Sequence, residues 1–363
     1  MSHYEARLQN DLARIRARIE DVGRRVEKAF ENSIHAVLTD DRELAAATVL
    51  GDLPINREIR DIDRLCRAFV ARHLPGAGHL RFVSSALRLN IELERVGDYA
   101  VAICREFNQL SQPLPDSVAR DIDIIGDQAK AMLHQAMKAF NQSNAELARG
   151  TKGMAAQVGA TYKKVFEDLL AEGEKGTRPV RDLFATLVIF NRIGRVGDQA
   201  KNFCEETLFV ATGETKEPKV YRVLFVDEKN STLSQMAAAY ARRAFPESGR
   251  YSSAGWHPAE QLDPRLARFA ESKSLDLKGA APKKLESIWD ELEDYHVIVG
   301  LEGDVRPHLK DVPFHSVMLT WDVGTAPGEV DQQRAEAMLE ESQRALAVKI
   351  SDLMQTLRGE GAA

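Results

Sequence analysis

The sequence predicts a multidomain α + α/β protein in which two tandem three-helix bundles precede one α/β domain with a parallel sheet. Three observations predict this fold class. The first 210 residues carry helical apolar spacing, a motif recurs at an offset of 100 residues, and short apolar strands alternate with helices beyond residue 218. The chain has 363 residues, which is long enough for two or three domains.

The first bundle is predicted over residues 1–111. Its opening helix carries an apolar seam with alternating spacings of four and three, made by Leu8, Leu12, Ile15, Ile19, Val22 and Val26. A turn at 39–41 separates it from a helix near 42–73. Pro75-Gly76 then breaks the chain before a third helix at about 79–110.

The second bundle is predicted over residues 112–211 because the first one recurs there. Residues 95–106 and 195–206 share seven identities in twelve positions, and Cys104 and Cys204 keep the register. A chance match between two helices would not fall in the equivalent helix of each half. We therefore interpret the helical region as a duplicated three-helix unit.

Residues 212–218 form a linker, since they combine Gly, Pro and charged residues. The α/β domain is predicted over 219–363. Strands are expected at 221–226, 250–254, 296–300 and 315–319, and helices at 235–245, 264–274, 283–293 and 332–357. This alternation predicts a parallel sheet covered on both faces.

Composition excludes several classes of function. The 49 Lys and Arg residues against 55 Asp and Glu give a net charge of −6, so we expect no binding of nucleic acid through bulk charge. No apolar run approaches the ~18 residues of a membrane span, and the first residues lack the apolar core of a signal peptide. Three sparse cysteines fit a reducing compartment. We expect a cytoplasmic protein, peripheral to a membrane at most.

Glu94 and Asp98 are the first candidate site residues. Their i, i+4 spacing places both carboxylates on one helix face, and carboxylates from several bundle helices can hold a divalent or ferric ion. The same pair could instead be solvated or paired with Arg95 or Arg88. Taken alone, this second interpretation is the commoner one.

The helical region resembles the PhoU family of phosphate-signalling proteins. The resemblance rests on residues 93–100, on their degenerate repeat at 193–200, and on Gly51-Asp52 followed by Asn56. It implies a metal cluster on the ExxxD motif of each bundle. It also implies a negative regulator of phosphate uptake that couples the ATPase of a phosphate ABC transporter to a sensor histidine kinase.

The second repeat departs from that pattern. Gly194 stands where the motif has glutamate, so that only Asp198 remains, and residues 153–162 offer no carboxylate. A hard cation prefers about six oxygen ligands. We therefore expect at most one divalent or ferric site, in the first bundle, built on Glu94, Asp98 and Asp52 with Asn56 as a further ligand. Metal identity and a homodimeric state stay open.

The α/β domain resembles low-molecular-weight protein tyrosine phosphatases and thioredoxin-coupled arsenate reductases over about 219–358. Both families place a Cys, five residues, Arg and Ser between a strand and a helix, and residues 251–255 resemble their second strand. Here Asp227 occupies the nucleophile position and Leu233 the position of the arginine that clamps the anion. Asn230 and Ser234 are retained and can shape the loop.

Loss of the nucleophile and of the clamp predicts a catalytically inactive, pseudophosphatase domain that serves for interaction or sensing. The general-acid Asp-Pro pair is missing as well, because Val323 follows Asp322. The alternative is an active phosphatase or arsenate reductase with a helical targeting arm, and a metal-storing bundle is a third interpretation. The expected function is regulation of phosphate uptake by protein–protein binding.

Overall fold

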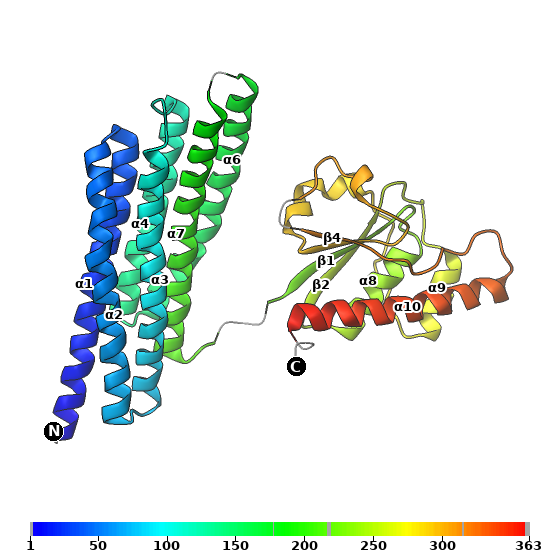
Figure 1. The fold of residues 1–363 in the computed structure, drawn as a ribbon. Helices are drawn as coiled ribbons and strands as arrows, with labels where there is room; N and C mark the ends of the chain where they lie inside the picture. Colours follow the sequence, from blue (N-terminus) through cyan, green and yellow to red (C-terminus); the bar gives the residue numbers. More distant parts are fainter. Residues whose placement is uncertain (1–2, 177, 216–218, 314–315, 360–363) are drawn as a thin grey trace. The chain divides into compact units, whose positions relative to one another are not determined.

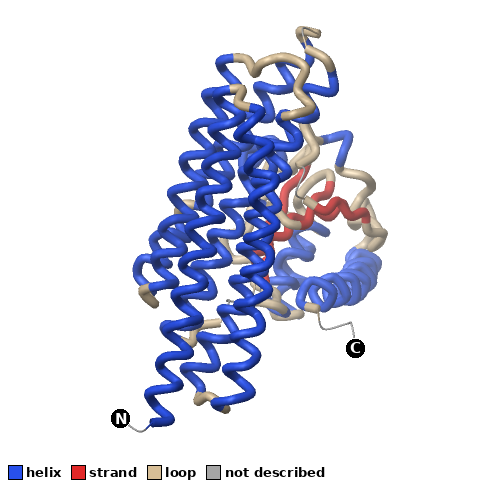
Figure 2. Tube along the Cα trace, turned by 60° about the vertical axis from the view of Figure 1, so that its left-hand side comes forward, coloured by secondary structure: helices blue, strands red, loops and turns tan. Residues whose placement is uncertain are grey.

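The computed structural model describes residues 3–176, 178–215, 219–313 and 316–359 (Figure 1). The chain divides into two compact units, Met1–Lys216 and Glu217–Ala363. Among the described residues the first unit is built from helices, and every strand lies in the second unit (Figure 2). The predicted fold class, a helical region followed by a parallel-sheet α/β domain, is confirmed.

In the first half of the helical unit, the described residues form three long helices, α1 (His3–Thr39), α2 (Arg42–His73) and α3 (Ala77–Phe107). All six residues of the predicted apolar seam of α1 are buried. Asp41 caps α2, because its carboxylate accepts a 2.8 Å hydrogen bond from the N–H of Leu44. The helix ends at Leu74, whose φ of 42° lies in the left-handed region. Each of the three helices packs against the other two.

The second half contains α4 (Asp116–Asn141), α5 (Ala145–Gly153), α6 (Ala155–Glu174) and α7 (Val180–Thr212). The prediction of three helices is wrong in one detail, because the middle one is divided into α5 and α6 at Met154. Gly150 and Gly153 precede this break, and each costs the helix about 1 kcal/mol relative to alanine. Helix α7 packs along both α3 and α4 (Figure 1). The described buried residues of the two halves form one continuous core.

Within the described residues, the α/β unit has four parallel strands in the order β2-β1-β3-β4. Its elements are β1 (Tyr221–Asp227), α8 (Leu233–Ala244), β2 (Gly249–Gly255), α9 (Pro264–Ser272), η1 (Leu285–Asp294), β3 (Val297–Gly300), η2 (Arg306–His308), β4 (Val317–Thr320) and α10 (Gln332–Arg358). In the central register Val223 of β1 pairs with Tyr251 of β2 and with Val297 of β3. The carboxyl ends of all four strands therefore meet at one edge of the sheet.

Strand β1 shows why both faces of the sheet are covered. Val223 and Phe225 are fully buried with side chains of α8, α9 and α10, whereas Leu224 and Val226 are fully buried in a second cluster with residues of η1. Since successive side chains of a strand point to opposite faces, a continuous apolar run requires cover on both.

Two predicted elements differ from the structure. The segment expected as a helix over 283–293 is the 3-10 element η1, which is kinked at Ile288, where φ is −119°. The sequence predicts the last strand over 315–319. Residues 314 and 315 lie outside the described residues, and β4 begins at Val317.

The three cysteines, Cys66, Cys104 and Cys204, are buried in the helical unit and form no disulfide. Burial raises the pKa values of these thiols to about 12, about 11 and about 12, respectively. Such thiols stay protonated and are poor nucleophiles. In the described part of the chain, no helix combines the length and the apolarity that crossing a bilayer requires.

Candidate functional site

The loop after β1 is organised around the buried carboxylate of Asp227, which is 3% exposed. Its Oδ1 accepts a 2.5 Å hydrogen bond from the backbone N–H of Asn230, and its Oδ2 accepts a 2.8 Å bond from the backbone N–H of Ser234. Ser234 lies in the first turn of α8, where backbone N–H groups are available to bind an anion. The carboxylate at the nucleophile position therefore occupies amide donors that could otherwise face an anionic ligand.

A third loop amide is also taken by an acidic side chain of the domain. The backbone N–H of Glu228 donates a 2.9 Å hydrogen bond to Oε2 of Glu302, which follows β3. Burial raises the pKa of Asp227 to about 6, and the negative charge of Glu302 adds to this effect, while the bonds from Ser234 and Asn230 oppose it. Three backbone amides of the loop are thus hydrogen-bonded to carboxylates of the chain itself.

Asn230 fixes the shape of the loop. Its φ of 48° lies in the left-handed region, which asparagine adopts more readily than most residues. Its Nδ2 donates to Oγ of Ser234 at 2.8 Å, and its Oδ1 accepts from the N–H of Lys283 at 2.7 Å and from Nε2 of Gln235 at 3.1 Å. The predicted residues Asn230 and Ser234 therefore contact one another directly. Gln235 belongs to the same network, but no motif in the sequence marked it.

Leu233 stands at the position expected for the clamping arginine, and its side chain is fully buried in the apolar core. It packs in the cluster that contains Met236 and Phe225 and therefore offers no charge to an anion. Lys229, the cation nearest in sequence, is exposed. The geometry gives this loop no bidentate donor of the kind that binds phosphate oxygens.

A cleft of about 490 Å³ lies at the carboxyl edge of the sheet, beside this loop. Residues that follow each of the four strands line it, namely Glu228, Trp256, Glu302 and Trp321, together with Asp322. This volume lies within the usual ~300–1,000 Å³ of ligand sites, and the edge is where open parallel sheets bind ligands. Trp256, Glu302 and Trp321 are far apart in sequence, and only the strand order brings them together.

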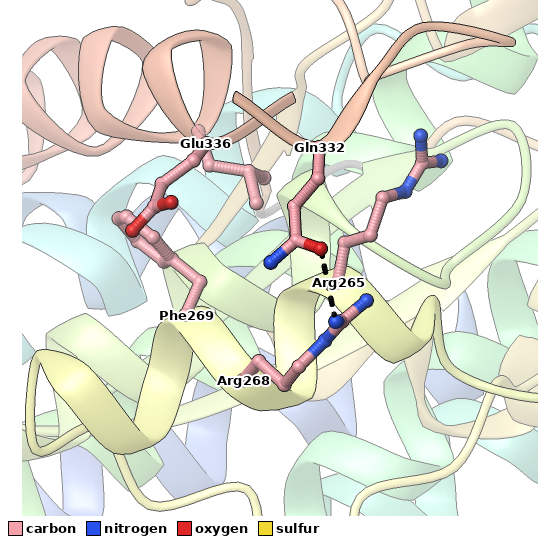
Figure 3. A pocket seen from close by; sticks show the side chains of 6 residues that line it. Arg265, Arg268, Phe269, Gln332 and Glu336 are labelled. Carbon is pink, nitrogen blue, oxygen red and sulfur yellow. Dashed lines mark hydrogen bonds between the residues drawn. The ribbon is translucent and has the colours of Figure 1, made fainter. Parts of the chain in front are cut away.

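A second hollow lies between α9 and α10 and is much smaller, about 70 Å³. Arg268 and Gln332 face each other across it, and the Arg268 guanidinium donates a 3.4 Å hydrogen bond to the Gln332 amide oxygen (Figure 3). Arg265 is ion-paired with Asp263 at 2.6 Å. Because this hollow is small and its arginines are paired within the domain, we regard the larger cleft as the candidate site.

In the helical unit, Asp52 and Asn56 lie together where α2 packs against α3. Nδ2 of Asn56 donates a 2.6 Å hydrogen bond to Oδ2 of Asp52. Oδ1 of Asp52 and Oδ1 of Asn56 are both buried and lack a hydrogen-bond partner. Gly97 allows this approach, because a Cβ built on it would lie 3.1 Å from Oδ1 of Asp52. Two unpartnered buried oxygens beside a glycine fit a cation-binding position.

Glu94 and Asp98 lie on the neighbouring helix α3, and both side chains are exposed. The pKa of Asp52 is raised by burial and, to a smaller extent, by the charge of Asp98, so these two carboxylates repel one another. Within the described residues, no three His, Cys, Asp or Glu side chains are already gathered around a metal position. Asp98 therefore lies close enough to Asp52 to act on its carboxyl, but the side chains of the predicted residues are not arranged as a finished coordination shell.

The second repeat shows what replaces this arrangement. A Cβ on Gly197, the counterpart of Gly97, would lie 3.3 Å from Cγ1 of Val158, so that the buried Val158 takes the place of Asp52. Asp198 is exposed and ion-paired with Arg195 at 3.3 Å, and Gly194 supplies no side chain. The close packing beside the glycine survives in the second repeat, where the described Val158 stands in place of a carboxylate.

Comparison with known proteins agrees with this division. The PhoU domain family matches residues 19–107 and 122–207, and the family described as low molecular weight phosphotyrosine protein phosphatase matches residues 222–320. The chain is 28% identical over 216 residues to the phosphate-specific transport system accessory protein PhoU of Serratia marcescens. That alignment covers 58% of this chain and 87% of the relative.

The protein of the same description from Escherichia coli is also 28% identical over 216 residues, with 58% of this chain and 88% of the relative covered. Among solved structures, the crystal structure of PhoU from Pseudomonas aeruginosa superposes with a TM-score of 0.55 and 27% identity. It covers 57% of this chain and 99% of its own. The chain therefore carries a PhoU domain in two repeats, fused to a domain of the low molecular weight phosphotyrosine protein phosphatase type.

Proposed function

We propose that this protein is a PhoU-type regulator of phosphate transport whose phosphatase-type domain binds a partner and does not turn over phosphate esters. The family match and the similarity to accessory proteins of phosphate transport support the first part. One observation carries the second part, namely that the carboxylate of Asp227 accepts the loop amides of Asn230 and Ser234.

The chemistry of the loop supports the absence of turnover. A phosphatase of this kind needs a nucleophile that leaves easily and donors aimed at the oxygens of the transferred group. Asp227 brings a buried carboxylate in place of a thiol, and Leu233 brings an apolar side chain in place of a guanidinium. Loss of a single donor of this type costs about a hundredfold or more in rate. The loop also places negative charge where a dianionic ester would bind.

The second domain has no cysteine that could carry out thiol chemistry. The sequence contains no cysteine after Cys204, and an arsenate reductase cascade requires several. The alternative of an active enzyme with a helical targeting arm thus rests on Asp227 alone, since a carboxylate can form an acyl phosphate.

Turnover of an aryl phosphate or of arsenate by the full chain separates the two proposals. We expect none above that of the Asp227→Ala variant. Turnover that depends on Asp227 would establish the enzyme instead.

The first bundle is proposed to hold one divalent or ferric ion. Asp52 and Asn56 would bind it through their unpartnered oxygens, and Glu94 and Asp98 would complete the shell from α3. When bound, the ion would supply positive charge that offsets the repulsion between Asp52 and Asp98. Metal analysis of the purified full chain tests this proposal. Substitution of both Glu94 and Asp98 by alanine is expected to remove the ion, and unchanged metal content would contradict the assignment.

The partners proposed for the helical unit are the ATPase of a phosphate ABC transporter and a sensor histidine kinase, both on the cytoplasmic side. This proposal rests on the similarity to phosphate-specific transport accessory proteins. Deletion of the gene in phosphate-replete cells should raise phosphate uptake, and the full chain should restore repression. Restoration by an Asp227→Ala chain would show that regulation does not require that carboxylate. Uptake unchanged by the deletion would contradict the regulator proposal.

A further inference from the structure

The cleft at the carboxyl edge of the sheet has a charge opposite to that of a phosphate site. Three carboxylates line it, those of Glu228, Glu302 and Asp322, and no lysine or arginine lies among its lining residues in the described part of the chain. The domain around it carries 23 acidic against 18 basic residues. An anionic ligand would be repelled here, whereas a cationic one would be attracted.

The loop beside the cleft adds to this preference. In a phosphate-binding loop, backbone N–H groups provide the positive end of the site. Here the amides of residues 228, 230 and 234 donate to Glu302 and Asp227, so their positive ends are directed at carboxylates of the domain itself. The side chain of Glu228 lines the cleft and is 49% exposed to solvent.

Two indole rings line the same cleft. Trp256 is half-buried and stacks in parallel on His308, with 4.1 Å between the ring centroids. Trp321 is 9% exposed and packs on Phe225 at 6.1 Å. Both rings are thus held in place by their neighbours. Trp321 is buried and offers little ring surface, so the half-buried Trp256 supplies the accessible indole of the cleft. An indole beside carboxylates is a combination that binds cations, since the ring face attracts positive charge and the carboxylates accept hydrogen bonds.

We propose that this cleft binds the guanidinium group of an arginine side chain presented by a partner protein. The planar guanidinium stacks on aromatic rings and donates bidentate hydrogen bonds to carboxylates, which a compact ammonium group does less well. The volume of about 490 Å³ exceeds what one guanidinium requires and leaves room for the flanking backbone of a peptide. The inference rests on the proposed function, because it names the partner chemistry of a domain proposed to bind and not to catalyse.

Calorimetric titration of the full chain with short peptides tests the proposal. The probes are acetyl-Gly-Arg-Gly-amide, its neutral citrulline counterpart, its lysine counterpart and inorganic phosphate. We expect the arginine peptide to bind about tenfold or more tightly than the citrulline peptide, the scale of a charge-assisted hydrogen bond, and to weaken as salt is raised. Equal binding of arginine and citrulline peptides, tighter binding of phosphate, or tighter binding of lysine than of arginine would overturn it.

Matched variants locate the binding. Glu228→Gln with Asp322→Asn removes two charges from the cleft while keeping side-chain size, and it should weaken the arginine peptide by about tenfold or more. Glu341→Gln with Asp352→Asn removes two exposed charges of α10 that do not line the cleft, and it should leave binding within about twofold, since exposed charges outside the site are screened by salt. Equal loss in both variants would refute the assignment to the cleft.

The same sample separates failure of this inference from failure of the proposed function. A chain that neither turns over aryl phosphate nor distinguishes arginine from citrulline refutes the ligand alone. A chain that turns over aryl phosphate refutes the proposed function, whatever the peptides do.

Discussion

Substitution of Asp227 by asparagine should change how the stability of the α/β unit depends on pH. The pKa of this buried carboxyl is about 6 in the folded chain, against an ordinary value of 3.8. Folding therefore favours the protonated form. The stabilising contribution is fully present below pH 3.8 and is lost as the pH rises through about 6. At 1.36 kcal/mol per pKa unit, the loss amounts to about 3 kcal/mol in the free energy of unfolding.

Urea unfolding followed by tryptophan fluorescence measures this effect. All three tryptophans, Trp256, Trp289 and Trp321, lie in the α/β unit, so the signal reports on that unit alone. The free energy of unfolding of the unaltered chain minus that of Asp227→Asn should fall by about 2 kcal/mol between pH 4 and pH 7, since part of the full change lies below pH 4. Groups common to both chains cancel in this difference.

A matched control is Asp352→Asn, which alters an exposed aspartate on α10. The difference in free energy of unfolding between this variant and the unaltered chain should stay constant from pH 4 to pH 7, because an exposed surface carboxylate contributes little to stability. A flat difference for Asp227→Asn, or one that rises with pH, would refute the conclusion that burial controls this carboxyl.

Two further predictions concern glycines at close contacts. Gly97→Ala should leave stability unchanged or raise it by up to about 1 kcal/mol through helix propensity. It should nevertheless lower the metal content of the first bundle, because its Cβ would displace Asp52, whereas Gly197→Ala should leave metal content unchanged. Equal metal content in both variants, measured by elemental analysis, would contradict this site. Gly255→Ala places a Cβ 2.7 Å from the backbone oxygen of Glu228 and should destabilise the α/β unit in the urea assay. An unchanged midpoint would contradict that contact.

Much of the fold follows from sequence pattern because local physics determines it. The seam from Leu8 to Val26 predicts a long buried helix, and the structure buries all six of its residues. The central strand was recognisable because an unbroken apolar run such as Val223–Val226 must be covered on both faces. The division at Met154 and the 3-10 geometry of η1 were missed, since periodicity alone does not separate a continuous helix from a kinked or tightened one.

The sequence by itself determined which groups are present at the candidate site. It placed a carboxyl at 227, an apolar side chain at 233 and the complete Glu94–Asp98 carboxylate pair in only one of the two repeats. The type of side chain at each of these positions is given by the sequence itself and does not depend on the fold.

Only the tertiary structure decided what these groups face. It directed the carboxylate of Asp227 onto the amides of its own loop and set Val158 opposite Gly197. It also gathered Trp256, Glu302 and Trp321 around one cleft. The physical reason is that parallel strand order and helix packing join residues far apart in the chain, and no local spacing in the sequence encodes that proximity.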